Sequence, residues 1–128
     1  MTQSQIGPDL KAQSITISNG IVALHREHYG RGAQRVRTIV HPEMVVTMLE
    51  DPFTTVEKTM IAQGAFLSVR ETRTLFQDWM GPPFRLIVEE ATGRKVRQFF
   101  SQIAHDPDYA LETFLLEPLT NGDGSGPA

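Results

Sequence analysis

The stretch RVRTIVHPEMVVTML, residues 35–49, decides the fold. Its two halves, RVRTIV and MVVTML, are rich in β-branched side chains, which favour strands. Only His41-Pro42-Glu43 separates them, and Pro42 has no N–H to contribute to a strand ladder. Because so short a link joins antiparallel neighbours, the stretch predicts a β-hairpin.

A second hairpin is predicted towards the C-terminal end. Residues 95–103 and 109–116 are β-like, and the turn cluster HDPD at residues 105–108 separates them. Both alternating sets of side chains in residues 109–116 include apolar ones, which is typical of a central strand. Leu116 is therefore predicted to lie in the core.

A helix is predicted ahead of the first hairpin, over residues 9–29, with Asp9 as a cap and Gly30 as the stop. Its apolar positions keep to one helical face. They are Leu10, Ile17, Ile21, Leu24 and His28.

Two further helices are predicted between the hairpins. The first begins at Thr54 or Thr55 and ends near Gly64. In the second, Gly81-Pro82-Pro83 predicts a kink or a short linker, after which the helical pattern resumes and ends at Gly93. One apolar stripe of this helix, in which Phe76 is predicted to be core, comprises Phe66, Val69, Arg73, Phe76 and Met80.

This order of elements predicts an α+β fold of two layers, in which helices cover one face of a mainly antiparallel four-stranded sheet. We expect one domain over residues 14–119. Residues 1–13 are polar and predict a flexible lead-in, and residues 120–128 are rich in Gly, Pro, Asp and Ser and predict a disordered tail.

Composition excludes several classes of protein. The 128 residues include no cysteine, which rules out thiolate metal sites, disulfides and cysteine nucleophiles. The net charge of −3 argues against a nucleic-acid partner. No apolar run is long enough for a membrane span, and the polar start lacks the pattern of a signal peptide, so we expect a cytoplasmic protein without direct membrane insertion.

Arginine is unevenly placed and marks a candidate site for an anion or an acidic partner. Glycines allow close backbone approach, and arginines supply forked donors to charged oxygens. The alternative is a solvated face whose charges pair with nearby acids. The candidate residues are Gly30, Arg31, Gly32, Arg35 and Arg37, with a second group at Arg94 and Arg97.

Catalytic and metal-binding patterns are weak. His25 and His28 share a helix face, but no third ligand is evident, so no metal site is predicted. No phosphate-binding loop, dinucleotide fingerprint or nucleophile elbow is present, and a non-enzyme is expected. Trp79, beside the prolines, is the candidate anchor of a protein interface.

Four segments carry a resemblance to a known family: residues 17–32, 46–59, 89–96 and 114–118. In this order they are similar to the MpsC-like family, which is named after a proposed sodium-translocating, membrane-potential-generating system. The resemblance implies a small bacterial protein, sometimes encoded beside inorganic-carbon or cation transport components. It implies no established catalytic residues, and no cofactor is expected.

The expected function is that of a non-catalytic accessory or regulatory protein that acts through protein contacts. A homodimer is expected, because a four-stranded sheet leaves edges that need cover. A membrane transport protein is the other expected partner. The alternative is an anion- or nucleotide-sensing protein that uses the arginine-rich loop.

Overall fold

Two hairpins build the sheet: β1 (Arg35–Val40) with β2 (Met44–Glu50), and β3 (Val96–Ala104) with β4 (Tyr109–Leu116). The strands lie in the order β1-β2-β4-β3, and all neighbours are antiparallel. Both predicted hairpins are confirmed, and so is the central position of residues 109–116.

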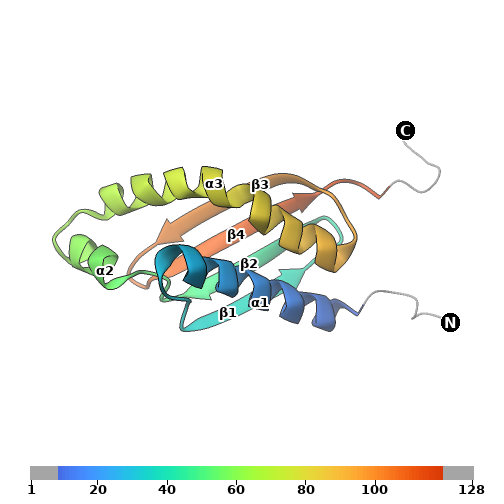
Figure 1. Cartoon of the computed structure of the whole chain (residues 1–128), viewed down its shortest axis with the longest axis horizontal. Helices are drawn as coiled ribbons and strands as arrows, with labels where there is room; N and C mark the ends of the chain where they lie inside the picture. Colours follow the sequence, from blue (N-terminus) through green and yellow to red (C-terminus); the bar gives the residue numbers. More distant parts are fainter. Residues whose placement is uncertain (1–8, 120–128) are drawn as a thin grey trace.

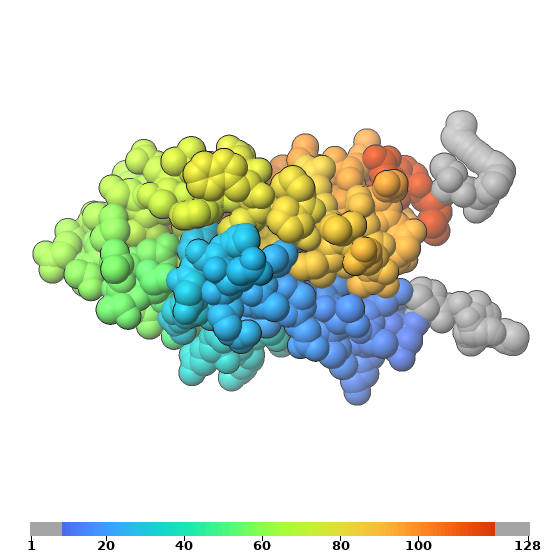
Figure 2. Space-filling view, viewed as in Figure 1, coloured from blue at the N-terminus to red at the C-terminus, as the bar shows by residue number. Residues whose placement is uncertain are grey.

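The helices form the second layer of the computed structural model, which describes residues 9–119. Helices α1 (Leu10–Tyr29) and α3 (Phe66–Thr92) lie on the same face of the sheet, and the short α2 (Thr55–Ala62) lies at one end (Figure 1). Figure 2 shows that α1 and α3 meet over the sheet. The predicted α+β class is confirmed.

The start of α1 is set by Asp9. Its carboxylate accepts hydrogen bonds from the backbone N–H groups of Lys11 and Ala12, at 3.1 and 3.2 Å. Residues 10–13 are therefore helical and do not belong to a flexible lead-in. The rest of the predicted lead-in, residues 1–8, and the predicted tail, residues 120–128, lie outside the described residues.

The start of α2 is a capping box. The N–H of Glu57 donates to the Thr54 hydroxyl at 3.1 Å, and the N–H of Thr54 donates to the Glu57 carboxylate at 2.9 Å. Gly64, at a φ of 86°, then turns the chain towards α3, a conformation that favours glycine. The predicted break at Gly64 is confirmed.

Helix α3 runs without a break through Pro82 and Pro83, so a linker at this point is wrong. Figure 1 shows instead that the two halves of α3 run in different directions, which is the kink expected where prolines remove helical hydrogen bonds. Met80 and Phe84 are both buried on the sheet side. Packing on either side of the prolines therefore keeps both halves on the sheet.

The core lies between the helices and the covered face of the sheet. Leu116 is buried and Phe76 packs, partly buried, against the same cluster. The predicted apolar face of α1 needs two corrections: Leu10 at the start of the helix is exposed, and His28 is exposed with His25 buried in its place. Steps of four from Ile17 through Ile21 lead to His25, which turns inward with them.

Candidate functional site

A buried arginine joins the elements at one end of the fold. Arg73 of α3 is only 6% exposed and binds Glu57 with two hydrogen bonds, Nε to Oε2 at 2.7 Å and Nη2 to Oε1 at 2.6 Å. Burial alone would raise the pKa of Glu57, but hydrogen bonds from Arg73 and Thr54 outweigh it and hold that pKa below its usual value. Glu57 is therefore a carboxylate held in its charged form.

The remaining faces of the Arg73 guanidinium are also occupied. Nη2 donates to the carbonyl oxygen of Pro52 at 2.8 Å, and Nη1 donates to Nε2 of His25 at 3.0 Å. The guanidinium carbon lies 3.8 Å from the centre of the Tyr29 ring. Arg73 thus connects α3 to α2, to the link before α2, and to the end of α1.

His25 is held as a neutral imidazole. A guanidinium can only donate, so Nε2 accepts from Arg73 and the proton lies on Nδ1, which donates to the carbonyl of Arg31 at 2.7 Å. Burial, and then the charge of Arg73, lower the pKa of His25 to about 4. Within residues 9–119 no group of three His, Asp or Glu side chains is placed to hold a metal ion.

Glu112 of β4 faces the same cluster from the sheet. It is 5% exposed, and its Oε1 has no hydrogen-bond partner among the described residues. Burial raises its pKa to about 7, against the opposing effects of a hydrogen bond from Ser101 and the charge of Arg73. The cavity that it lines with His25 and Tyr29 measures only about 20 Å³, which leaves no room for a substrate.

Glu112 also belongs to a polar row across the covered face of the sheet. The register aligns Thr38, Thr47, Glu112 and Ser101 on the four strands. The hydroxyls of Thr38 and Thr47 are 2.9 Å apart, and Ser18 of α1 approaches Thr38 at 2.7 Å. The face beneath the helices is therefore partly polar, and hydrogen bonds satisfy most of it.

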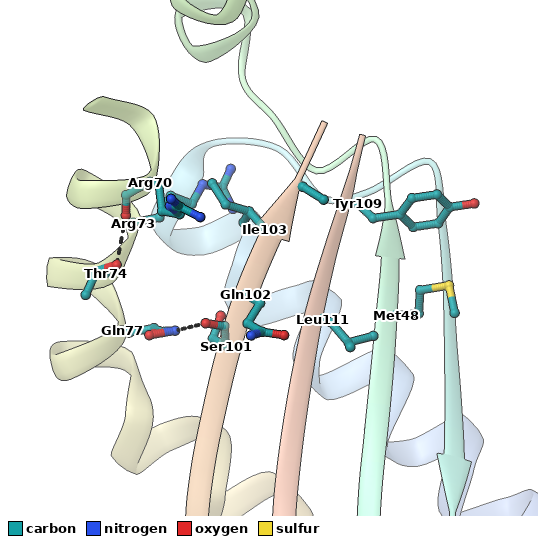
Figure 3. Close-up of a pocket in the computed structure, with 11 residues that line it drawn as sticks. Met48, Arg70, Arg73, Thr74, Gln77, Ser101, Gln102, Ile103, Tyr109 and Leu111 are labelled. Carbon is teal, nitrogen blue, oxygen red and sulfur yellow. Dashed lines mark hydrogen bonds between the residues drawn. The ribbon is translucent and has the colours of Figure 1, made fainter. Parts of the chain in front are cut away.

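An open pocket of about 590 Å³ adjoins this cluster at Arg73 and lies at the β3 edge of the sheet (Figure 3). Gln77 of α3 closes part of the strand edge, because its Nε2 donates to the carbonyl of Ser101 at 2.9 Å. Tyr109, Leu111 and Met48 also line the pocket and point away from α3 in Figure 3. The pocket therefore continues from the α3–β3 junction onto the uncovered face of the sheet.

The predicted arginine site divides into two groups at opposite ends of the sheet. Arg31 binds the carbonyl of Phe53 and, at 3.3 Å, the carboxylate of Asp51. At the other end, Arg94 donates to the carbonyls of Pro42 and Glu117, at 2.9 and 2.8 Å. Each of these guanidiniums joins segments of the chain. Because they lie at opposite ends of the sheet, the two groups do not form one surface.

The other residues of the predicted site are Gly30 and Gly32, which flank Arg31, and Arg35, Arg37 and Arg97 on the strands. Gly30 caps α1 at a φ of 81°, and Gly32 lies so close to α1 that a Cβ would come within 3.1 Å of Val22. Arg35 lies 3.6 Å from Glu50. Arg37 and Arg97 are exposed, and Arg35 and Arg37 extend from the same face of β1 as predicted. Anion binding here stays a prediction.

Trp79 lies on the outer side of α3 and is 67% exposed. Leu75, Pro82 and Leu86 are exposed at steps of four, three and four residues along the same helix, so they share its face. We call these four residues the outer stripe. The Phe76 ring supports Trp79 edge-to-face, with 5.4 Å between ring centres.

Sequence reasoning did not identify the Arg73 cluster as a site. The signals were present: Arg73 lies in an apolar helical stripe, and Glu112 lies in an apolar alternation of β4. Charged residues at inward positions need partners. That ground alone could have singled out Arg73 and Glu112, although the carboxylate that binds Arg73 is that of Glu57.

Comparisons with known proteins return one family. The model described as Na⁺-translocating membrane potential-generating system (MpsC) matches residues 11–118, which is most of the chain. Neither the curated proteins nor the solved structures include a match. Within the described residues, no helix combines the length and the apolar character required to cross a membrane.

Proposed function

The chain belongs to the MpsC family, and on this premise we propose that it is a non-catalytic accessory or regulatory protein of a cation or inorganic-carbon transport system. It acts on the cytoplasmic side, through contact with a subunit of the transporter. The family description supports the link to a Na⁺-translocating system, and the partner contact is argued from the surface of α3.

The outer stripe is the observation that carries this proposal. Exposed aromatic side chains supported by a second ring are typical anchors of protein interfaces. Trp79 has this support from Phe76, and Leu75 and Leu86, 57% and 52% exposed, extend the apolar surface on either side. An apolar helix face of this kind fits a groove or a second helix on the partner.

The test is the Na⁺-dependent membrane potential of the native host, followed with a potential-sensitive dye. Deletion of the gene for this chain is expected to lower the potential that develops when NaCl replaces KCl. Wild type supplied from a plasmid restores it. Trp79→Ala is expected to fail, because truncating an interface tryptophan weakens binding by about 2 kcal/mol or more, roughly 30-fold.

Leu67→Ala provides the matched control. Leu67 is on α3 and 63% exposed, but it lies outside the outer stripe, so this variant is expected to restore the potential fully. An unchanged Na⁺-dependent potential in the deletion strain would overturn the proposed link to transport. Full restoration by Trp79→Ala would overturn the role of the outer stripe.

A further inference from the structure

We propose that the uncovered face of the sheet is the interface between two copies of this chain. We call it the open face. It consists of the strand residues that alternate with those beneath α1 and α3, and no helix of residues 9–119 packs on it. The inference goes beyond the proposed function, which requires a transport partner and no second copy.

The centre of the open face is mainly apolar, with Thr113 as its polar member. On the two central strands it carries Met44, Val46 and Met48 of β2, and Leu111, Thr113 and Leu115 of β4. Such strands, apolar on both faces, are typical of sheets that are covered on both sides. Helices α1 and α3 cover only one of the two faces.

The edges of the open face combine two apolar contacts with a polar rim. One row of the register consists of Ile39, Val46, Thr113 and Phe100. Its end residues, Ile39 and Phe100, are 58% and 49% exposed. The next row begins with Arg37 and ends with Gln102. An apolar centre within a polar rim is the usual anatomy of an interface core.

The register makes this face self-complementary in one arrangement. A two-fold axis parallel to the strands stacks β1 of one copy over β3 of the other and keeps the rows aligned. Ile39 then lies over Phe100, and Arg37 over Gln102. The arginines of the two copies fall at opposite edges, separated by roughly three strand spacings of about 4.8 Å.

The other two-fold arrangement is unfavourable. An axis perpendicular to the strands stacks β1 on β1 and reverses the rows; midway between the rows of Ile39 and Arg37, it places one over the other. It also gathers the arginines of both copies at one edge, where only Glu50 of each open face provides an opposite charge. Like charges brought together in an interface are costly, so the parallel axis is the predicted one.

The size of the face suits a small dimer. Four strands of about seven residues, at roughly 4.8 Å spacing and 3.3 Å rise, project to about 400 Å². This projected area, with its polar rim included, lies within the roughly 300–600 Å² of the largest apolar patch on an ordinary monomer. The adjoining pocket brings each copy towards the roughly 600–800 Å² buried by small stable interfaces.

Light scattering after size exclusion, at tens of micromolar, tests the dimer. Wild type is expected at twice 14.3 kDa. Leu111→Glu, with a charge at the centre of the open face, is expected to raise the dissociation constant at least about a hundredfold and to run as a folded monomer. Leu67→Glu, at an exposed position of α3, is the matched control and is expected to remain dimeric.

Cross-linking tests the arrangement without relying on a disruptive variant. Because the chain contains no cysteine, Ile39→Cys and Phe100→Cys each introduce a single thiol. A mixture of the two variants, treated with a short bis-maleimide, is expected to give a species of twice the mass. Either variant alone is expected to give little, because identical positions lie at opposite edges.

Three results would overturn the proposal. Wild type that is monomeric at tens of micromolar excludes the second copy as the occupant. A dimer that resists Leu111→Glu but dissociates with Trp79→Ala moves the interface to the outer stripe. Cross-linking of Ile39→Cys alone, without the mixed product, excludes the parallel axis. Each outcome is independent of the membrane-potential experiment, so the two proposals can fail separately.

Discussion

The two faces of this sheet differ less in polarity than is usual for a sheet with one covered face. The face beneath the helices carries a polar row that includes Thr38, Thr47 and Glu112, and the charged Arg73 cluster lies against it. The face without helices carries Met, Val and Leu along both central strands. Buried polar groups need matched partners, whereas apolar groups need only cover.

This difference indicates what each face does. On the covered face, the hydrogen bonds of Arg73 require one arrangement of α1, α2 and α3, so that face specifies the fold. On the open face, apolar side chains remain available for a second surface. Substitutions on the two faces test this division.

The largest effect is expected from Arg73→Met. The substitution leaves Glu57 charged and nearly buried without its partner, so the free energy of unfolding is expected to fall by about 3–5 kcal/mol. Urea denaturation followed by circular dichroism measures it. Arg70→Met, one turn away and exposed, is the control and is expected to cost less than about 1 kcal/mol. Equal losses would show that the cluster is not the structural centre of the covered face.

Neighbouring leucines on β4 give the next contrast. Leu116 is 5% exposed and belongs to the core beneath the helices, so Leu116→Ala is expected to cost about 2–5 kcal/mol. Leu115 points to the open face, and Leu115→Ala is expected to cost the separated monomer less than about 1 kcal/mol while weakening self-association. The measurements are denaturation at submicromolar concentration and light scattering. A reversed order would contradict the assignment of the faces.

These contrasts also show how far sequence reasoning reaches. Residues 35–40 and 109–116 were predicted with the bounds that the structure has, because alternation and Gly or Pro punctuation are local signals. The unbroken α3 was missed, since the packing of Met80 and Phe84 on the sheet outweighs the local effect of two prolines. The sequence pattern of one helix does not show how the helix packs against the rest of the protein.

The candidate site was less accessible to prediction. Arg73 and His25 are 48 residues apart in the chain, and no spacing rule brings them together. The order β1-β2-β4-β3, which places Glu112 beside that cluster, depends on how the two hairpins associate. Trp79, in contrast, was predicted as an exposed anchor, because its position beside the prolines is a local feature and tryptophan is common at interfaces.

The pH dependence of stability tests the covered face more finely. The folded-state pKa of Glu112 is raised from 4.5 to about 7. Through this group the free energy of unfolding therefore falls by about 3 kcal/mol as pH rises from 4.5 to 7. The folded-state pKa of His25 is lowered from 6.5 to about 4, so this group loses a similar amount as pH falls. The two effects oppose each other, and wild type is expected to be nearly flat between about pH 4.5 and 6.5.

Glu112→Gln separates the two contributions. With the carboxyl removed, the free energy of unfolding is expected to decline by up to about 3 kcal/mol on acidification from pH 6.5 to 4, because Glu112 no longer offsets the lowered pKa of His25. Glu57, whose pKa is also lowered, adds to this decline towards pH 4. Urea denaturation at a series of pH values measures this slope. A variant whose profile coincides with that of wild type would show that Glu112 is not buried as described.

The smallest effect is expected at the rim of the open face, from Arg35→Ala/Arg37→Ala. Arg35 approaches Glu50 only at 3.6 Å and its side chain is 73% exposed, so solvent screens the pair and unfolding is expected to change by less than about 1 kcal/mol. Rim charges act more on association rate than on affinity, so the dimer is expected to persist.

Titration with inorganic phosphate tests the anion hypothesis with the same variant. If wild type binds phosphate at these arginines, the double substitution should weaken phosphate binding at least about tenfold, since each arginine–oxygen pair contributes about 1.5–3 kcal/mol. A loss of stability as large as that of Leu116→Ala would mean that the rim, and not only the covered face, specifies the fold.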